Sequence, residues 1–178
     1  MMIPESLLQS TRELSGLLRA RGRQITTVES CTGGLVGACL TALPGSSDIY
    51  PGGFISYSNE LKQRVVGVST STLESYGAVS AQTGIEMALG GLQHAQADFA
   101  IAITGIAGPD GGSQEKPVGT VWICVANREG YQDCRRFIFP GDRDQVRAQS
   151  ADTSMRMAIQ ALGGGVASLP HEAEHWQG

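Results

Sequence analysis

The chain has 178 residues, of which 41% are hydrophobic and 17% charged, and its formal net charge is −4. This length and hydrophobic content predict one compact domain and exclude a disordered chain. The negative balance, with no lysine- or arginine-rich run, argues against nucleic acid as a partner.

The N-terminus shows no charged leader followed by an apolar core, and no apolar run approaches membrane length. We therefore expect a cytoplasmic protein that has no membrane partner. The four cysteines, Cys31, Cys39, Cys124 and Cys134, form no C-x-x-C pair. In a reducing compartment all four are expected to be free thiols.

The first half of the chain alternates helical and strand patterns. Leucines recur at helical spacing before Gly22, and an apolar segment after it is typical of a buried strand. The predicted elements are a helix at 4–21, a strand at 25–30, a helix from near Gly33 to before Pro44, a strand at 52–58, and a short helix capped by Ser58 or Asn59 that ends at Gln63 or Val66.

The second half continues the alternation and adds a hairpin. Residues 99–105 are almost wholly apolar, as in a strand covered on both faces. The predicted elements are helices at 71–76 and 81–96, strands at 99–105, 119–127 and 131–139 with a hairpin turn at 128–130, and a last helix from Asp142 to about Leu162. Together they predict an α/β fold, a single-domain layered structure with a mixed β-sheet flanked by helices.

The C-terminal segment contains an H-E-x-x-H pattern at residues 171–175. Three glycines at 163–165 end the last helix, so we expect a domain at 1–165 and a mobile tail at 166–178. On a helix, the pattern would present two imidazoles to zinc. Such sites usually draw a third ligand from further along the chain, and only three residues remain, so we interpret the pattern as chance and expect no metal.

Two glycine-containing loops follow predicted strands at their carboxyl ends, where open α/β sheets gather ligands. The loop at 29–34 offers hydroxyls and helix-start N–H groups to an anion, although an ordinary capped helix start is the alternative. Cys31 lies in this loop, but no histidine is near it in sequence, which favours a packing role. The loop at 104–112 resembles a substrate cradle and matches neither common nucleotide-binding pattern, so ATP and NAD chemistry are not indicated.

A serine-rich turn at 44–48 precedes Lys62, which is predicted in the first turn of a helix. A serine nucleophile needs a base, and a neutral lysine can serve where no histidine is placed to do so. A surface lysine and a turn serine are the alternative. Arg143 and Arg147 begin the last helix and either clamp a phosphate or carboxylate or pair with neighbouring aspartates on a solvated face.

Five motifs together resemble the nicotinamide mononucleotide deamidase family, the stand-alone form of the CinA C-terminal domain. The motifs are VESCTGG (28–34), PGSSDIYPGGFISYSNELK (44–62), YGAVS (76–80), TGIAGPDGGSQEKPVGTVW (104–122) and GDRDQVR (141–147). The resemblance covers about residues 5–162. It implies an amidohydrolase that uses a Ser/Lys pair, no metal and no cofactor, and that assembles as a homodimer or a higher homo-oligomer.

The resemblance also implies roles for individual residues. Ser47 would be the nucleophile, although its neighbour Ser46 leaves the choice partly open; Lys62 would be the base, and Tyr57 would polarise the pair or relay protons. The implied substrate-binding residues are Ser30, Thr32, Gly33, Gly34, Ser46, Thr104, Gly105, Gly108 and Arg143, with Arg147 as the alternative to Arg143.

The implied reaction hydrolyses the carboxamide of nicotinamide mononucleotide to nicotinate mononucleotide and ammonia, in pyridine nucleotide salvage. The rival hypothesis is a non-catalytic nucleotide-binding regulatory domain, related to the CinA proteins of competence and DNA damage, that would use the same loops without turnover.

Overall fold

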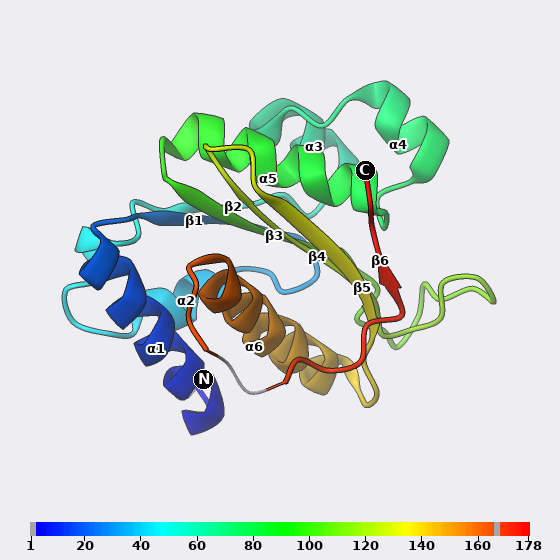
Figure 1. Ribbon diagram of the computed structural model, residues 1–178. Coiled ribbons are helices and arrows are strands. Elements are labelled where there is room, and N and C mark those ends of the chain that lie inside the picture. The colour runs from blue at the N-terminus through cyan, green and yellow to red at the C-terminus, as the bar shows by residue number, and fades with distance from the viewer. Residues whose placement is uncertain (1–2, 166–167) are drawn as a thin grey trace.

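Helices and strands alternate along the chain in the computed structural model, which describes residues 3–165 and 168–178 (Figure 1). The elements are α1 (Glu5–Arg21), β1 (Ile25–Glu29), α2 (Leu35–Thr41), the 3-10 turn η1 (Ser46–Asp48), β2 (Gly53–Ile55), α3 (Asn59–Val66), α4 (Thr70–Tyr76), α5 (Ala81–Ala95), β3 (Phe99–Gly105), β4 (Thr120–Asn127), β5 (Gln132–Ile138), α6 (Arg143–Ala161) and β6 (Glu174–His175). The predicted helices and strands are present, with ends shifted by a few residues.

The strands form one mixed sheet in the order β2-β1-β3-β4-β5-β6. β1 is parallel to both β2 and β3, whereas β4, β5 and β6 are each antiparallel to the preceding strand. The chain leaves β1 toward β2 on one side and later returns to β3 on the other. The carboxyl end of β1 is therefore a topological switch point, where α/β sheets bind ligands.

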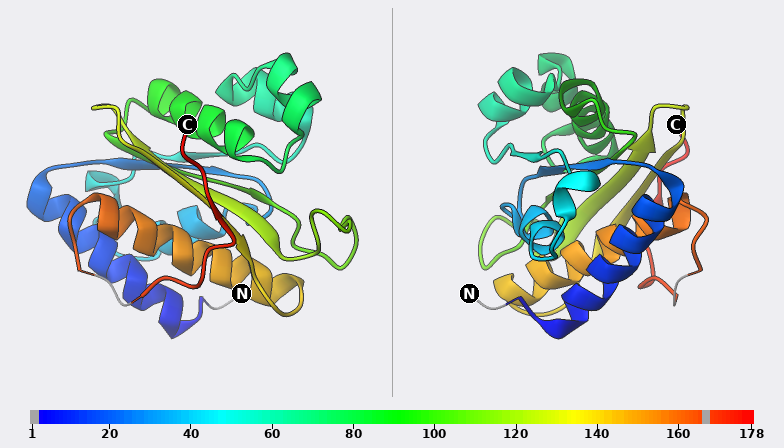
Figure 2. Two further views of the ribbon diagram at one scale, coloured as in Figure 1. Left: turned by 45° about the vertical axis from the view of Figure 1, so that its right-hand side comes forward. Right: turned by 90° about the vertical axis from the view of Figure 1, so that its left-hand side faces the viewer.

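Helices cover both faces of the sheet, which confirms the predicted layered α/β fold (Figure 2). α1, α2 and α6 pack on one face, and α3, α4 and α5 lie on the other. Along β3, Ile101 and Ile103 join the first core cluster, while Ala100 and Ala102 join the second. This alternation explains why β3 is apolar throughout, because both of its faces are buried.

Three of the predicted helix starts are confirmed by side-chain caps. Ser58 and Ser80 accept hydrogen bonds from the backbone N–H groups of Leu61 and Thr83, at the starts of α3 and α5. Asp142 forms a reciprocal capping box with Gln145 at the start of α6. These caps fix the first turns of α3 and α6, which carry Lys62 and Arg143.

The helix predicted from Gly33 and the strand predicted at 52–58 are both shorter in the structure. The helix expected from Gly33 begins only at Leu35, because Gly33 and Gly34 adopt left-handed conformations with φ of 60° and 94°. The strand expected at 52–58 ends at Ile55, where the chain turns so that the carbonyls of Ser56 and Tyr57 face the amine of Lys62.

The end of the chain carries an element that the sequence did not reveal. β6 pairs antiparallel with β5, and the Arg135 and Arg136 guanidinium groups form ion pairs with Glu172 at 3.0 Å and Glu174 at 3.3 Å. Val166 and Ala167, which belong to the expected mobile tail, lie outside the described residues. The mobility of the tail stays a prediction.

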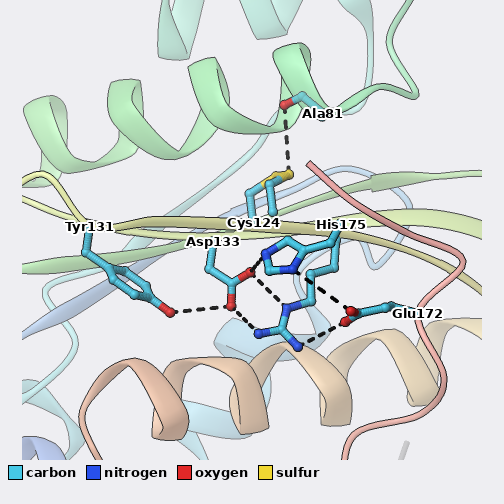
Figure 3. Close-up of polar contacts among 8 residues, drawn as sticks. Ala81, Cys124, Tyr131, Asp133, Glu172 and His175 are labelled. Carbon is cyan, nitrogen blue, oxygen red and sulfur yellow. Dashed lines mark hydrogen bonds and ion pairs between the residues drawn. A yellow bond between two sulfur atoms is a disulfide. The ribbon is translucent and has the colours of Figure 1, made fainter. Parts of the chain in front are cut away.

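The expectation of four free thiols is wrong for Cys124 and Cys134. These residues lie directly opposite each other on β4 and β5, with Cα atoms 4.0 Å apart, and form a disulfide (Figure 3). The hairpin register creates this proximity, which spacing along the chain does not show. Cys31 and Cys39 are free and buried.

Within residues 3–165 and 168–178, every helix is too short or too polar to cross a membrane.

Candidate active site

A cavity of about 270 Å³ opens at the carboxyl ends of β1 and β3, beneath the start of α6. Its polar lining includes Ser30, Tyr57, Lys62, Thr104, Asp110 and Arg143. Gly105 and Gly108 also line it, so much of the expected site lies around one pocket. The location agrees with the position predicted for ligands in an open α/β sheet.

Lys62 is the most buried charged side chain of this pocket, with an exposed fraction of 1%. It projects from α3, and its Nζ lies 3.0 Å from Ser30 Oγ, 2.8 Å from the Ser56 carbonyl oxygen and 3.3 Å from that of Tyr57. Burial disfavours the charged ammonium and lowers the pKa of Lys62 from 10.5 to about 8.

The three contacts of Lys62 can be made in either protonation state of its amine. The ammonium has three N–H donors and donates to Ser30 Oγ and to the two carbonyls. In the neutral amine the two carbonyls can accept both N–H groups, which leaves the lone pair for the hydroxyl proton of Ser30. This arrangement suits a lysine that acts as a general base toward a serine.

Ser47 lies at the other end of β1 from Lys62. The turn η1 that carries Ser47 is held beside the start of β1, because the Ile25 N–H donates to the Ile49 carbonyl at 2.8 Å. Five residues of extended chain, from Ile25 to Ser30, cover about 16 Å. The structure therefore does not bring Ser47 to Lys62, and neither Ser46 nor Ser47 lines the pocket.

Arg143 and Tyr57 meet at the mouth of the pocket. Arg143 donates one hydrogen bond to the Gly108 carbonyl at 2.7 Å and another to the Tyr57 hydroxyl at 2.9 Å. The Tyr57 side chain is 58% exposed, and it is the carbonyl of this residue, rather than its hydroxyl, that contacts Lys62. Arg147 instead donates to the Thr32 carbonyl at 2.9 Å and does not line the pocket.

The helix start after Ser30 is not open to an anion in the way the sequence suggested. The carboxylate of Glu29 accepts hydrogen bonds from the backbone N–H groups of Gly34, Val36 and Gly37. Of the residues expected in this loop, Ser30 lines the pocket, whereas Thr32, Gly33 and Gly34 do not. Arg143 is thus left as the cation best placed to meet an anionic group.

The pocket is also lined by Ala78 and Val79, which the sequence did not identify as site residues. The Thr104 hydroxyl donates to the Ala78 carbonyl at 2.7 Å, and Lys116 Nζ donates to the Val79 carbonyl at 2.8 Å. Both residues belong to the YGAVS motif, and this motif was the signal in the sequence that could have identified them. Their backbone contacts depend on the fold and could not be predicted from the sequence.

Cys31 borders the pocket but is poorly suited to act as a nucleophile. It is 5% exposed, and burial raises the pKa of its thiol to about 11. The thiol is therefore protonated at neutral pH. This state agrees with the packing role that the sequence favoured.

The histidine pattern of the tail is engaged with carboxylates of β5 and of the tail itself. His175 Nε2 lies 3.1 Å from Asp133 Oδ1, and its Nδ1 lies 3.9 Å from Glu172 Oε1 (Figure 3). In the described part of the chain, no group of three or more His, Cys, Asp or Glu side chains is arranged to hold a metal ion.

Comparison with known proteins places this site in a family context. The profile of the CinA C-terminal domain matches residues 8–162. The chain belongs to the CinA C-terminal domain family. This membership confirms the resemblance carried by the five motifs.

Relatives of different length match the chain. The chain is 50% identical over 159 residues to a protein of Escherichia coli strain K12 named nicotinamide-nucleotide amidohydrolase PncC, covering 89% of this chain and 96% of that protein. It is 45% identical over 142 residues to a CinA-like protein of Leptospira biflexa, covering 80% of this chain and 34% of that protein. The chain thus matches the short form along nearly its whole length.

Solved structures of CinA proteins share the fold. The crystal structure of a competence/damage inducible protein from Agrobacterium tumefaciens has a TM-score of 0.88 and 38% identity, covering 92% of this chain and 99% of that chain. A CinA superfamily protein from Klebsiella pneumoniae has a TM-score of 0.85 and 39% identity, covering 88% and 98%.

Proposed function

We propose that this protein hydrolyses the carboxamide of nicotinamide mononucleotide to nicotinate mononucleotide and ammonia. The observation that carries the proposal is the buried Lys62 amine, 3.0 Å from the hydroxyl of Ser30 inside the pocket. The amidohydrolase name of a relative that is 50% identical supports the same reaction.

We further propose that Ser30, rather than Ser47, is the nucleophile. Ser30 lies 3.0 Å from the Lys62 amine inside the pocket, whereas Ser47 lies near the opposite end of β1. The Ser/Lys chemistry implied by the family resemblance is kept, with a different serine. Tyr57 takes a binding role beside Arg143 in place of a proton relay.

In the proposed mechanism, neutral Lys62 accepts the hydroxyl proton while Ser30 Oγ attacks the amide carbon. Backbone N–H groups of the glycine-containing loops would hold the oxyanion of the tetrahedral intermediate. The C–N bond then breaks, and the Lys62 ammonium gives its proton to the nitrogen that leaves as ammonia. Water, deprotonated by Lys62, hydrolyses the acyl-enzyme and regenerates the Ser30 hydroxyl.

Arg143 would bind the phosphate of the nucleotide. Its guanidinium has five N–H donors, and the contacts with Gly108 and Tyr57 use two of them. The remaining donors can form a charge-assisted pair with phosphate oxygens at the pocket mouth. Lys62 would then face the carboxamide at the deep end of the pocket.

We also propose that the protein acts in the cytoplasm and assembles as a homodimer or a higher homo-oligomer; the assembly is what the family resemblance implies. Ile55 of the edge strand β2 is 54% exposed and Leu61 of α3 is 38% exposed, so apolar surface is available near the pocket. Light scattering of the purified protein measures the assembly.

The function is tested by ammonia release from nicotinamide mononucleotide, with and without a chelator, and with free nicotinamide as a control substrate. We expect release from the nucleotide that persists in the chelator, and much slower release from nicotinamide, because nicotinamide has no phosphate for Arg143. Release that stops in the chelator would contradict the metal-free mechanism. Tight binding without release would favour the regulatory nucleotide-binding hypothesis.

A further inference from the structure

We propose that Glu29 is a positioning residue that holds Ser30 against Lys62. The inference concerns the serine of the proposed function and therefore rests on it. Glu29 is the last residue of β1 and directly precedes Ser30, yet its own side chain does not line the pocket. Its action on the chemistry would thus pass through the backbone.

The Glu29 side chain is almost completely buried and is bound by backbone groups alone. Its exposed fraction is 1%. Oε2 accepts hydrogen bonds from the backbone N–H groups of Gly34 at 3.0 Å and Val36 at 3.2 Å. Oε1 accepts one from the backbone N–H of Gly37 at 2.9 Å. Among the described residues, no cationic side chain forms an ion pair with this carboxylate. Three N–H donors at the positive end of α2 compensate for its charge.

These bonds close the chain into a fixed turn around Ser30. The left-handed conformations of Gly33 and Gly34 bring the start of α2 back toward Glu29. Within the turn, the Ser30 N–H donates to the Ile103 carbonyl at 3.0 Å, and the Ser30 carbonyl accepts from the Gly33 N–H at 3.0 Å. Both sides of Ser30 are therefore anchored, one to β3 and the other to Glu29 through α2.

Gly37 provides the space that this arrangement needs. A Cβ atom at position 37 would lie 2.7 Å from the hydroxyl oxygen of Tyr50 and 3.6 Å from Glu29 Oε1. The lack of a side chain lets the N–H of residue 37 reach the carboxylate. The chain is thus shaped at Gly33, Gly34 and Gly37 around one acidic side chain.

A change at Glu29 should affect the rate of the chemical step more than substrate binding. Displacing a reacting atom by about 1 Å costs about a hundredfold in rate. Among the described residues, the Glu29 carboxylate is hydrogen-bonded by Gly34, Val36 and Gly37, none of which lines the pocket, so the KM for the nucleotide should change little. Burial, rather than Glu29, sets the pKa of Lys62, so the midpoint of the pH profile should also remain in place.

Two variants and one matched control test this role. Glu29→Gln places an amide N–H group where a backbone N–H needs an acceptor, and Glu29→Asp keeps the charge but shortens the side chain. We expect kcat to fall about 10- to 100-fold in both variants, with the KM within twofold of wild type and an unchanged pH midpoint. Glu86→Gln is the control, because Glu86 accepts from the Ser69 N–H at 2.7 Å beside the start of α4 and does not line the pocket. This control should lose stability without losing kcat.

A second readout separates this inference from the proposed substrate. Phenylmethanesulfonyl fluoride reacts with an activated serine: the serine oxygen bonds to sulfur, fluoride leaves, and the base takes the proton. Peptide mapping should place the label on Ser30 in wild type, at a rate that falls in both Glu29 variants and not in Glu86→Gln. If wild type is labelled but releases no ammonia from the nucleotide, the proposed function fails while the role of Glu29 is still measured.

The inference is overturned if folded Glu29→Gln or Glu29→Asp retains wild-type kcat and labelling rate. Failure of both variants to fold, with Glu86→Gln folded, would assign Glu29 to the stability of the domain and would also overturn the positioning role. A KM that rises while kcat stays constant would place Glu29 in substrate binding instead.

Discussion

Burial of one lysine amine determines the chemistry available to this pocket. With a pKa of about 8 for Lys62, about one amine in ten is neutral at pH 7, whereas at the ordinary 10.5 about three in ten thousand would be. As the proposed base, Lys62 would therefore be about 300-fold more available than a surface lysine. The proposed activation of a serine by Lys62 needs no histidine.

The pH dependence of activity follows from this depressed pKa. In the proposed mechanism the neutral amine is the active form, so kcat/KM should rise with pH toward about 8 and level off above it. Lys62→Arg should lower kcat/KM by at least about a hundredfold at every pH, because a guanidinium stays protonated. Initial rates of ammonia release between pH 6 and 9.5 test both statements. A flat profile for wild type, or an active Lys62→Arg variant, would contradict the assignment of Lys62 as the base.

At the residue scale, the proposed base is the one that the sequence predicted, whereas the proposed nucleophile is not. Lys62 and Arg143 line the pocket as expected, and Ser30 was assigned to substrate binding. The family resemblance implied Ser47, which shares the motif at 44–62 with Lys62. A residue that precedes β2 lies at the amino end of a strand parallel to β1, whereas Ser30 follows β1 at its carboxyl end. Strand direction, rather than proximity in sequence, separates the two serines.

At the element scale, the loop between β3 and β4 is fastened to the end of α4 by Lys116. Its Nζ donates to the Val79 carbonyl at 2.8 Å and to the Tyr76 carbonyl at 3.3 Å. A cation at the last carbonyl groups of a helix is favourable. Since Gly108 and Val79 both line the pocket, Lys116 connects the two segments of chain that carry them.

Replacing Lys116 should therefore weaken binding without slowing the chemistry. Lys116→Met removes both hydrogen bonds, and we expect the KM for nicotinamide mononucleotide to rise about three- to tenfold, as for the loss of a net hydrogen-bond contribution of about 1 kcal/mol. kcat should stay within twofold of wild type, because Lys62 and Ser30 are not contacted. Glu115→Gln, a neighbouring exposed change, is the control for steady-state kinetics. An unchanged KM, or a parallel fall in kcat, would contradict this role.

The element boundaries that the sequence predicted are helix starts set by side-chain caps. Ser58, Ser80 and Asp142 cap helices where expected, because each cap depends on residues three positions away. β2 is shorter than expected because the carbonyls of Ser56 and Tyr57, which directly follow it, turn toward the amine of Lys62. β6 was missed because a two-residue strand depends on its pairing with β5 rather than on its own pattern.

At the scale of the whole molecule, the alternation of helices and strands along the sequence predicted the layered α/β fold. It also predicted the edge of the sheet that holds the pocket. The carboxyl ends of β1 and β3 meet because both strands run parallel, so their loops converge on one cavity. The Cys124–Cys134 pair depends on hairpin register, and the tail's contacts with Asp133 depend on side chains far apart in sequence. Such pairings arise from the folded arrangement and have no local signature.

The central claim is that the serine at the carboxyl end of β1, rather than the one near its amino end, attacks the amide. Turnover of nicotinamide mononucleotide by Ser30→Ala and Ser47→Ala, measured side by side with substrate affinity, tests it most directly. We predict that Ser30→Ala loses about a thousandfold or more in kcat while it still binds the nucleotide, and that Ser47→Ala stays within twofold of wild type. An active Ser30→Ala enzyme together with an inactive Ser47→Ala enzyme would contradict the account.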